Sequence, residues 1–478
     1  MIGRAEILAA AGDLSLAPEV VEKDYVLGWL LAGIYAHKAL APTWAFKGGT
    51  CLKKCYFETY RFSEDLDFTI TDPVQLDENF LKTTFADISA WIYDATGLVV
   101  PADRCRFDVR LNPRGGLSCE GRIYYEGPLR GGRSSLPRIK LDLTVDEVLV
   151  MPAVERPVGH PYSDLPDGGI VARCYAYEEV FGEKVRALAE RTRPRDLYDV
   201  INLFRHDEFR PAAATVLGVL REKCRFKSIS VPTFAALAGA TGELLADWKA
   251  MLGHQLPVLP PFEAFWDALP GFFAWLETGV EPEALPSTPV LAGSDGELFR
   301  PAVGLLRRQG IAGSSYLETI RFAGANRLCV DLDYTDKTGR RSTRRIEPYS
   351  LRRSRTGDIL VYAFRSDGTG VRAYLLHAIN SVQVSDQTFV PRYAIELTAG
   401  EIGAIPPTSR DAVFSASAAK AYRFPTTRSH HGPTYVYKCP SCGKSFRRTK
   451  ADAHLNPHKT QQGWACPGRT GYLVETKY

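Results

Sequence analysis

The feature that most constrains this chain is the stretch Phe46–Thr50 (Phe-Lys-Gly-Gly-Thr), followed ten residues later by Arg61–Phe68 (Arg-Phe-Ser-Glu-Asp-Leu-Asp-Phe). A tight glycine turn that carries a hydroxyl and opens a helix can hold a triphosphate through backbone N–H groups. Two carboxylates one residue apart on a strand point to the same face and can bind Mg²⁺ together. The two patterns together predict chemistry on a nucleoside triphosphate.

Moving a nucleotide to an acceptor requires an activated nucleophile, a polarised phosphorus and a stabilised pyrophosphate, and two divalent ions about 4 Å apart can serve all three. Asp65 and Asp67 have the required spacing, and Asp142, on a second predicted strand, is a candidate third carboxylate. Gly49 and Thr50 are candidates for the β- and γ-phosphates. Taken alone, an Asp-x-Asp pair is usually a solvated strand or turn, and Gly-Gly-Thr is usually only a turn.

A second cluster follows on two predicted helices. Lys184 is a candidate to neutralise the triphosphate, although a single helical lysine is more often solvated. In Arg193–Asp199 (Arg-Pro-Arg-Asp-Leu-Tyr-Asp), Asp196 and Asp199 share a helix face by their i,i+3 spacing. Either aspartate can orient Lys184 or Arg195.

Length and composition indicate a multidomain globular protein. The 478 residues suffice for about three domains, and 45% hydrophobic with 24% charged residues is ordinary for a globular chain. No apolar run approaches the roughly 20 residues of a membrane span, and the N-terminus has no signal-peptide pattern. The ten cysteines are mostly scattered, which favours a reducing cytoplasm. We therefore expect a cytoplasmic protein.

Periodicity and turn residues divide the chain into units. We expect helices at 20–31, 52–57, 80–95, 177–191 and 196–204, and strands at 43–46, 66–70, 106–111, 121–125 and 138–145. A proline-rich crossing is expected at 152–166. The expected domains are a core at 1–210, a helical domain at 211–285, linkers at 286–300 and 401–434, a β domain at 301–400 and a basic module at 435–478.

In combination and in this order, the motifs resemble the AbiEii/AbiGii toxin family of nucleotidyltransferases. Its signatures are Phe-Lys-Gly-Gly-Thr, Arg-Phe-Ser-Glu-Asp-x-Asp and Arg-Asp-x-x-Asp, and the match runs from Val20 to about residue 280, including Glu22-Lys23-Asp24. The resemblance implies an α+β multidomain protein with a polymerase-β-like core and a helical domain. Characterised members act as toxins of toxin–antitoxin or phage-defence systems, and some add nucleotides to tRNA.

The resemblance also implies roles for individual residues. The residues expected to bind the NTP substrate are Lys47, Gly48, Gly49, Thr50, Ser63 and Arg195. The expected catalytic set is Asp65, Asp67, Asp142, Lys184, Asp196 and Asp199, of which Asp65 and Asp67 hold Mg²⁺.

Residues 316–390 resemble a WYL domain, an Sm-like β-barrel of bacterial regulators and defence proteins. The similarity rests on Val330–Tyr334, Arg344–Leu351 and Ile359–Phe364, although Val-Tyr-Ala replaces the naming Trp-Tyr-Leu. By this resemblance a nucleic acid or nucleotide would bind at Tyr334, Arg345, Arg372 and Tyr374. The alternative is that the tyrosines are core and the arginines are solvated.

Cys439 and Cys442 have the two-residue gap that lets two thiolates bind one tetrahedral Zn²⁺. Cys466 is the best third ligand, and His458 or His454 supplies the fourth. We prefer His458 because it lies in the loop leading to Cys466. A small module with little core can depend on a metal to fold, so we expect a zinc ribbon here.

Basic residues concentrate in two places, although net charge is only +4. Residues 337–355 hold eight basic residues and one acid, and the zinc knuckle is followed by Lys444, Arg447, Arg448 and Lys450. Such basic clusters can bind the phosphate backbone of a nucleic acid, or they can be solvated surface residues. We therefore expect RNA such as tRNA, or DNA, as a partner, together with a cognate antitoxin and no membrane. The alternatives are a non-catalytic nucleic-acid-binding regulator and transfer of a nucleotide to a protein.

Overall fold

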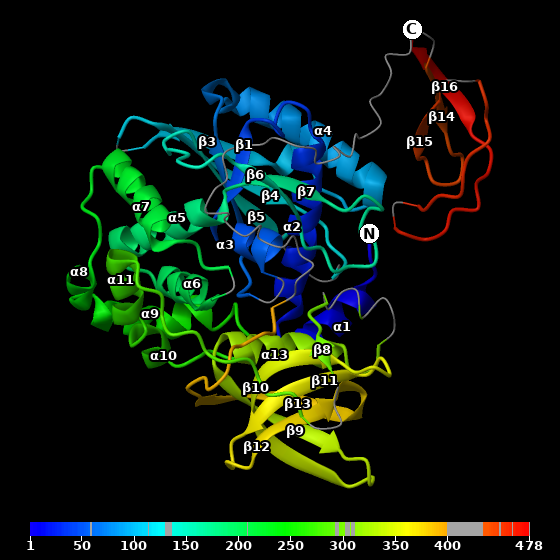
Figure 1. The fold of residues 1–478 in the computed structure, drawn as a ribbon. Helices are drawn as coiled ribbons and strands as arrows, with labels where there is room; N and C mark the ends of the chain where they lie inside the picture. The colour runs from blue at the N-terminus through cyan, green and yellow to red at the C-terminus, as the bar shows by residue number, and fades with distance from the viewer. Residues whose placement is uncertain are drawn as a thin grey trace.

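The computed structural model describes residues 1–57, 60–112, 114–129, 136–207, 209–291, 296–301, 306, 311–398, 434–448, 451–460 and 462–477. Figure 1 shows an N-terminal α/β core with a group of helices beside it, a β-rich domain below it and a small C-terminal module at one side. The expected α+β multidomain architecture is therefore confirmed. None of the helices in the described ranges is both long and apolar enough to cross a membrane.

A seven-stranded mixed sheet forms the centre of the core, in the order β3-β4-β5-β2-β1-β7-β6. Its strands are β1 (Trp44–Lys47), β2 (Asp65–Ile70), β3 (Arg106–Leu111), β4 (Leu117–Tyr124), β5 (Arg138–Thr144), β6 (Val154–Pro157) and β7 (Val171–Cys174). Strand β2 pairs antiparallel with β1 and parallel with β5. Strand β2 is therefore the central strand of the sheet.

Successive side chains of β2 alternate between the buried core and the opposite face of the sheet, where the two aspartates lie. Leu66 and Phe68 are buried, and the ring of Phe68 packs 5.1 Å from that of Trp44, which in turn contacts Phe85 of helix α4 (Glu78–Thr96). Helices α1 (Arg4–Leu14) and α2 (Pro18–Ala36) precede the sheet in the chain. Because successive strand residues point to opposite faces, Asp65 and Asp67 lie on the face away from this core.

The glycine turn continues directly into helix. Helix α3 (Gly48–Cys51) is prolonged by the π-helical turn η1 (Leu52–Tyr56). Short 3₁₀ turns are η2 (Pro73–Gln75), η3 (Ala102–Arg104) and η4 (Leu376–Ala378). The remaining core helices are α5 (Tyr177–Arg191), α6 (Pro194–Arg205), α7 (Ala213–Lys227), α8 (Phe234–Ala238), α9 (Thr241–Leu252), α10 (Glu263–Trp266) and α11 (Leu269–Thr278). The aromatic side chains of α9–α11 are largely core, since Trp248 and Trp275 are buried and Phe181 stacks on Trp275.

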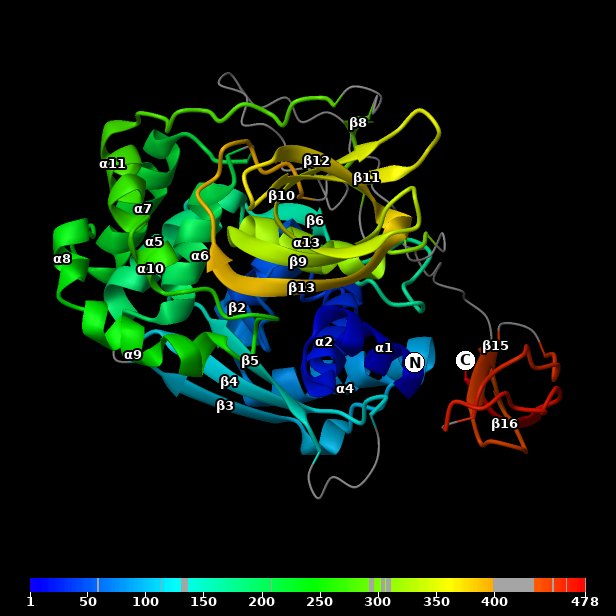
Figure 2. The ribbon, with the colours of Figure 1, turned by 90° about the horizontal axis from the view of Figure 1, so that it is seen from below.

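The second sheet lies beneath helix α13 (Ser315–Ala325), and its strands run in the order β12-β11-β10-β9-β13 with β8 added to β10. They are β8 (Glu297–Leu298), β9 (Leu328–Thr335), β10 (Arg341–Arg353), β11 (Ile359–Arg365), β12 (Gly370–Leu375) and β13 (Ile379–Thr388). The sheet is strongly curved (Figure 2). The strand pairings in the described residues leave its order open, so closure into a barrel stays a prediction.

The C-terminal module has a three-stranded antiparallel sheet in the order β15-β14-β16. Its strands are β14 (Thr434–Lys438), β15 (Ser445–Arg448) and β16 (Tyr472–Lys477). The linker expected at 401–434 lies outside the described residues except for Thr434, as do Lys450 and residues 292–295 of the first linker. A small cluster around Tyr437 and Leu455 is the core of the module.

Candidate active site and metal centre

A cavity of about 190 Å³ opens on the carboxylate face of the central sheet. Eight of the residues that the sequence singled out line it, namely Gly49, Ser63, Asp65, Asp67, Asp142, Lys184, Arg195 and Asp196. Arg61, Lys140, Arg191 and Arg193 complete the lining. The cavity therefore presents six basic side chains beside four carboxylates, a combination suited to a phosphate-rich ligand and a divalent cation.

Strand register places the carboxylates side by side. Asp67 is paired with Asp142 across β2 and β5, and Asp65 is paired with Lys140. Burial, reinforced by repulsion from Asp142, raises the pKa of Asp67 to about 6. Burial also raises the pKa of Asp65, against the opposing charge of Lys140. Bringing these carboxylates together in a partly dry site costs free energy that a bound cation would recover.

The donor set fits a divalent cation of the magnesium type, because all three candidate ligands are carboxylates that share one cavity. In a tight three-ligand group, one oxygen of each carboxylate would lie within 4.8 Å of the others. Asp65, Asp67 and Asp142 do not form such a group in the described residues. Oδ2 of Asp142 accepts a hydrogen bond of 2.8 Å from Lys140 Nζ within the same cavity. Asp65 and Asp67, whose pKa values are raised by burial, are the principal candidates.

The glycine turn fits closely against these carboxylates. Gly48 has a φ of +83°, and a Cβ atom there would lie 2.2 Å from Oδ2 of Asp67. Only glycine meets both conditions. Thr50 is 1% exposed, and its hydroxyl donates a hydrogen bond of 2.5 Å to the carbonyl of Asp65. Thr50 thus ties the turn to β2 and does not line the cavity.

Lys47 also stays outside the cavity lining. Its Nζ lies 3.7 Å from the carboxylate of Glu147 and 5.8 Å from the ring centroid of Tyr175. Since Lys47 is paired with Asp67 in the sheet, its charge partly offsets the raised pKa of Asp67. Its contribution to the site is therefore electrostatic.

Asp199 is the centre of a buried ion network. Its side chain is fully buried and accepts two hydrogen bonds of 2.7 Å from Arg61 and one of 2.9 Å from Tyr60. Lys184 Nζ lies 2.7 Å from Oδ2. Although burial alone would raise it, the charges of Arg61 and Lys184 hold the pKa of Asp199 well below its usual range. Asp199 is therefore a positioning residue that fixes two cations of the cavity.

Asp196, three residues earlier on α6, is placed differently. Its Oδ1 lies 3.4 Å from Lys184 and 3.2 Å from Arg191, whereas Oδ2 is buried without a hydrogen-bond partner in the described part of the chain. Such an orphaned oxygen on the cavity wall is available to a ligand. The two aspartates of the motif therefore differ in role.

Sequence reasoning did not assign Arg61, Lys140, Arg191 and Arg193 to the site. Arg61 stands inside a quoted motif, but its partner Asp199 is distant in sequence. The Glu22-Lys23-Asp24 stretch connects α2 to other parts of the core. Asp24 accepts a buried hydrogen bond of 2.8 Å from Lys54, and Lys23 forms an ion pair with Glu64. Three cysteines that appeared scattered, Cys51, Cys55 and Cys174, lie together in the core with their sulfur atoms within 4.8 Å of one another.

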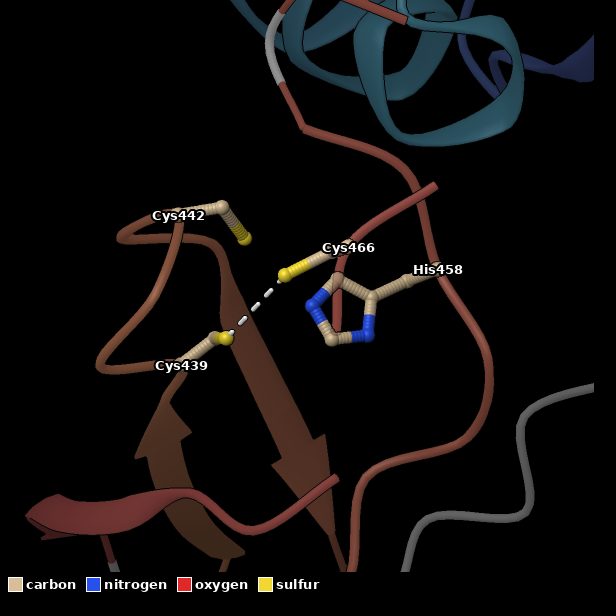
Figure 3. A group of neighbouring side chains, drawn as sticks. All are labelled: Cys439, Cys442, His458 and Cys466. Carbon is tan, nitrogen blue, oxygen red and sulfur yellow. Dashed lines mark hydrogen bonds between the residues drawn. The ribbon is translucent and has the colours of Figure 1, made fainter. Parts of the chain in front are cut away.

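In the C-terminal module, Cys439, Cys442, His458 and Cys466 point toward one another (Figure 3), with their potential ligand atoms within 4.8 Å. The sulfur atoms of Cys439 and Cys466 are 3.7 Å apart. Nδ1 of His458 lies 2.9 Å from the carbonyl of Asn456, and its Nε2 is buried with no partner in the described residues. An imidazole that donates through Nδ1 presents Nε2 as a ligand, so the set fits tetrahedral Zn²⁺.

Two further features favour a metal at this position. Burial opposes the change, but hydrogen bonds from the backbone N–H groups of Cys442 and Ser441 lower the pKa of Cys439 to about 6, toward the thiolate that zinc binds. A Cβ on Gly468 would lie 2.4 Å from the sulfur of Cys439, so glycine is required beside the cluster. His454 makes backbone contacts with Asp452 and Thr470 and stays outside the cluster.

The four residues predicted to bind a ligand on the second sheet make the following contacts. Tyr334 and Tyr374 pack edge to face with ring centroids 5.2 Å apart, and Tyr374 is buried. Arg345 pairs with Asp331 through two hydrogen bonds of 2.8 Å. Arg372 donates to the carbonyl of its neighbour Val371. The tyrosines are thus partly core, as the alternative interpretation expected.

Comparison with known proteins gives two family matches. Residues 29–271, about half of the chain, match the model for the nucleotidyl transferase AbiEii toxin of type IV toxin–antitoxin systems, and residues 315–384 match the WYL domain. No curated protein matches the chain. Among solved structures, the nucleotidyltransferase toxin MenT4 of Mycobacterium tuberculosis is 17% identical with a TM-score of 0.37, covering 59% of this chain and 91% of its own.

The proteasome accessory factor PafBC of Arthrobacter aurescens is 16% identical with a TM-score of 0.16, covering 54% of this chain and 36% of its own. Both structural similarities are too low to carry an argument, so the assignment rests on the family models and on the motifs within them. The chain belongs to the AbiEii family of nucleotidyltransferase toxins and carries a WYL domain after the transferase core.

Proposed function

We propose that this nucleotidyltransferase moves a nucleotide from an NTP to an RNA acceptor such as tRNA, in a Mg²⁺-dependent reaction in the cytoplasm. The observation that carries the proposal is the single cavity in which Asp65, Asp67 and Asp142 face six basic side chains. A protein that bound nucleic acid without catalysis would not need buried carboxylates with raised pKa values beside those cations.

Each group has a role in this proposal. Lys184 and Arg195 neutralise the triphosphate, and Gly49 leaves room for the guanidinium of Arg61, which a Cβ there would meet at 2.4 Å. Asp65 and Asp67 hold Mg²⁺, which supplies charge neutralisation at the reacting phosphate. Asp196, with its free Oδ2, orients Lys184 or receives the acceptor hydroxyl. The α-phosphorus–oxygen bond to pyrophosphate breaks as the bond to the acceptor oxygen forms.

The acceptor is proposed to be RNA because the chain continues into modules suited to nucleic acid. The WYL match and two basic residues of β15, the exposed Arg447 and the half-buried Arg448, lie beyond the transferase core. Zn²⁺ bound by the Cys439 cluster would hold these cations on a rigid module. The toxin family also implies an antitoxin partner that restrains the enzyme.

Incubation with each α-³²P-labelled NTP and total RNA, with Mg²⁺ or with EDTA, tests the proposal. We expect Mg²⁺-dependent labelling of RNA that Asp65→Ala or Asp67→Ala abolishes. Asp108→Ala is the matched control, since Asp108 lies in the same cross-strand row of carboxylates but on β3 and is 57% exposed. Label on protein would refute the RNA acceptor, and labelling by both aspartate variants would refute the site.

A further inference from the structure

A second cavity, of about 290 Å³, is lined by residues of both the transferase core and the WYL domain. Its walls come from the C-terminal end of α6, the residue after η1, the end of α13 and the segment 391–398. It shares no lining residue with the transferase cavity. It is therefore a separate compartment, of a size at the lower end for small-molecule pockets.

Four arginines line this cavity: Arg205, Arg300, Arg321 and Arg327. Arg205 is the most informative, because its Nε and Nη1 are buried and have no hydrogen-bond partner in the described residues. Its remaining Nη2 donates to the carbonyl of Ala264. A buried guanidinium with two unsatisfied N–H groups is costly unless a ligand accepts them.

No ion pair to a carboxylate is found for Arg205 among the described residues, although its guanidinium lies 4.8 Å from the ring centroid of Phe265. Burial, together with repulsion from Arg327, lowers the pKa of Arg205 well below its usual range. Burial lowers the pKa of Arg327 to about 10, and Arg210 adds to this effect. Arg327 further adopts a φ of +57° at the end of α13, a conformation that non-glycine residues rarely hold. Both arginines would be stabilised by an anion between them.

Two carboxylates also line the cavity, and each contacts a group outside the four arginines. Oε1 of Glu396 accepts a hydrogen bond of 2.8 Å from Ser287, whereas Oε2 lies 4.0 Å from Arg352 and is buried without a hydrogen-bond partner in the described residues. Asp207, two residues after Arg205, pairs with Arg210. The cavity thus has an excess of positive charge over the carboxylates that line it.

The lining also contains apolar and aromatic side chains. The rings of Phe57 and His206 stack with centroids 4.4 Å apart, and Leu285, Ile395 and Leu397 belong to the same lining. Arginines and flat apolar surface in one cavity are the two elements that hold a phosphate and a base. We propose that this cavity binds a nucleoside monophosphate, with its phosphate between Arg205 and Arg327 and its base on the aromatic side.

Binding can be tested without the transferase reaction. Asp65→Ala/Asp67→Ala serves as the background protein, in EDTA, and AMP, GMP, CMP and UMP are titrated by calorimetry. We expect at least one monophosphate to bind with one-to-one stoichiometry, and its nucleoside or inorganic phosphate to bind at least tenfold more weakly. Because the catalytic carboxylates are absent, failure of the proposed function does not affect this result.

Two substitutions locate the site by independent means. Arg327→Glu reverses the charge, and Ala325→Leu fills the cavity without changing charge, since Ala325 lines it at the last position of α13. Each should weaken binding at least tenfold, with circular dichroism and thermal unfolding used to verify the fold. Arg225→Glu is the matched control, because Arg225 is 73% exposed on α7 and pairs only locally with Glu222.

The proposal is overturned if no monophosphate binds at millimolar concentration, or if Ala325→Leu and Arg327→Glu, both folded, bind as the background protein does. It is also overturned if a 5′-phosphorylated oligonucleotide of four residues binds more tightly than every monophosphate. That result would assign the cavity to the end of a nucleic acid chain.

Discussion

Replacing Asp199 by Asn tests whether the last aspartate of the Arg-Asp-x-x-Asp motif is structural. The substitution keeps the shape of the side chain and removes the charge that holds Arg61 and Lys184. Three close contacts to cations are weakened, each 2.7 Å long and fully buried. Leaving buried cations uncompensated costs about 3–5 kcal/mol of unfolding free energy. For a domain of this size, 1 kcal/mol corresponds to roughly 2–4 °C in Tm.

Asp196→Asn is the matched comparison on the same helix. Its contacts to Lys184 and Arg191 are longer, at 3.4 and 3.2 Å, and Oδ2 has no partner in the described residues. We expect a loss of about 1 kcal/mol at most, the value of a weak charged hydrogen bond. Its effect should instead appear as a large fall in nucleotidyl transfer, since Asp196 lines the cavity and its Oδ2 has no partner in the described residues.

Thermal unfolding and transfer assays on the two variants separate these roles. The pH dependence adds a further measurement, because a carboxyl whose pKa is depressed on folding stabilises the protein above its unfolded pKa of about 4. That stabilisation declines as pH falls through the lower folded pKa of Asp199, so Asp199→Asn should flatten the acid limb of the stability curve. Equal losses of Tm in the two variants, or an unchanged acid limb, would refute this reasoning.

Two shorter predictions follow. Gly48→Ala should displace Asp67, cost about 1–2 kcal/mol for the left-handed backbone and reduce Mg²⁺-dependent activity more than stability; unchanged activity by NTP labelling would contradict it. Cys442→Ser should remove zinc from the purified protein as measured by atomic absorption, and unfold the C-terminal module, whereas His454→Ala should keep the metal. Zinc retained by Cys442→Ser would argue against the four-ligand set.

Local pattern was sufficient to predict the carboxylate face and most of the core elements. Alternation in Asp65–Ile70 placed both aspartates on one side of a strand, and the helix expected at 177–191 coincides with α5. The predictions were weaker where pairing is non-local. Strands β6 and β7 were missed, because β6 has only four residues and lies inside the proline-rich crossing. The edge strand β6 and its neighbour β7, each of four residues, acquire their structure from the adjacent strands, a contribution that a window of sequence does not contain.

The different roles of the residues within each motif could likewise not be predicted from local sequence. Arg61 and Asp199 are separated by 138 residues, and only the tertiary fold brings them together. The contact of Thr50 with the carbonyl of Asp65 depends on the close fit of the glycine turn over β2. A motif therefore identifies residues that serve the same site, and the fold determines which of them contact the ligand and which position the others.

The arrangement of cations explains why this site needs its positioning residues. Arg61 and Lys184 are paired with Asp199, Lys140 with Asp142, and Arg191 with Asp196, so four of the six bases in the cavity already have a carboxylate partner. Paired cations keep fixed positions without repelling one another, and their remaining N–H groups stay available for a triphosphate. A cavity of the same bases without these acids would be strongly positive and poorly ordered. The aspartates of the last motif thus prepare the site for an anion while adding little negative charge at its centre.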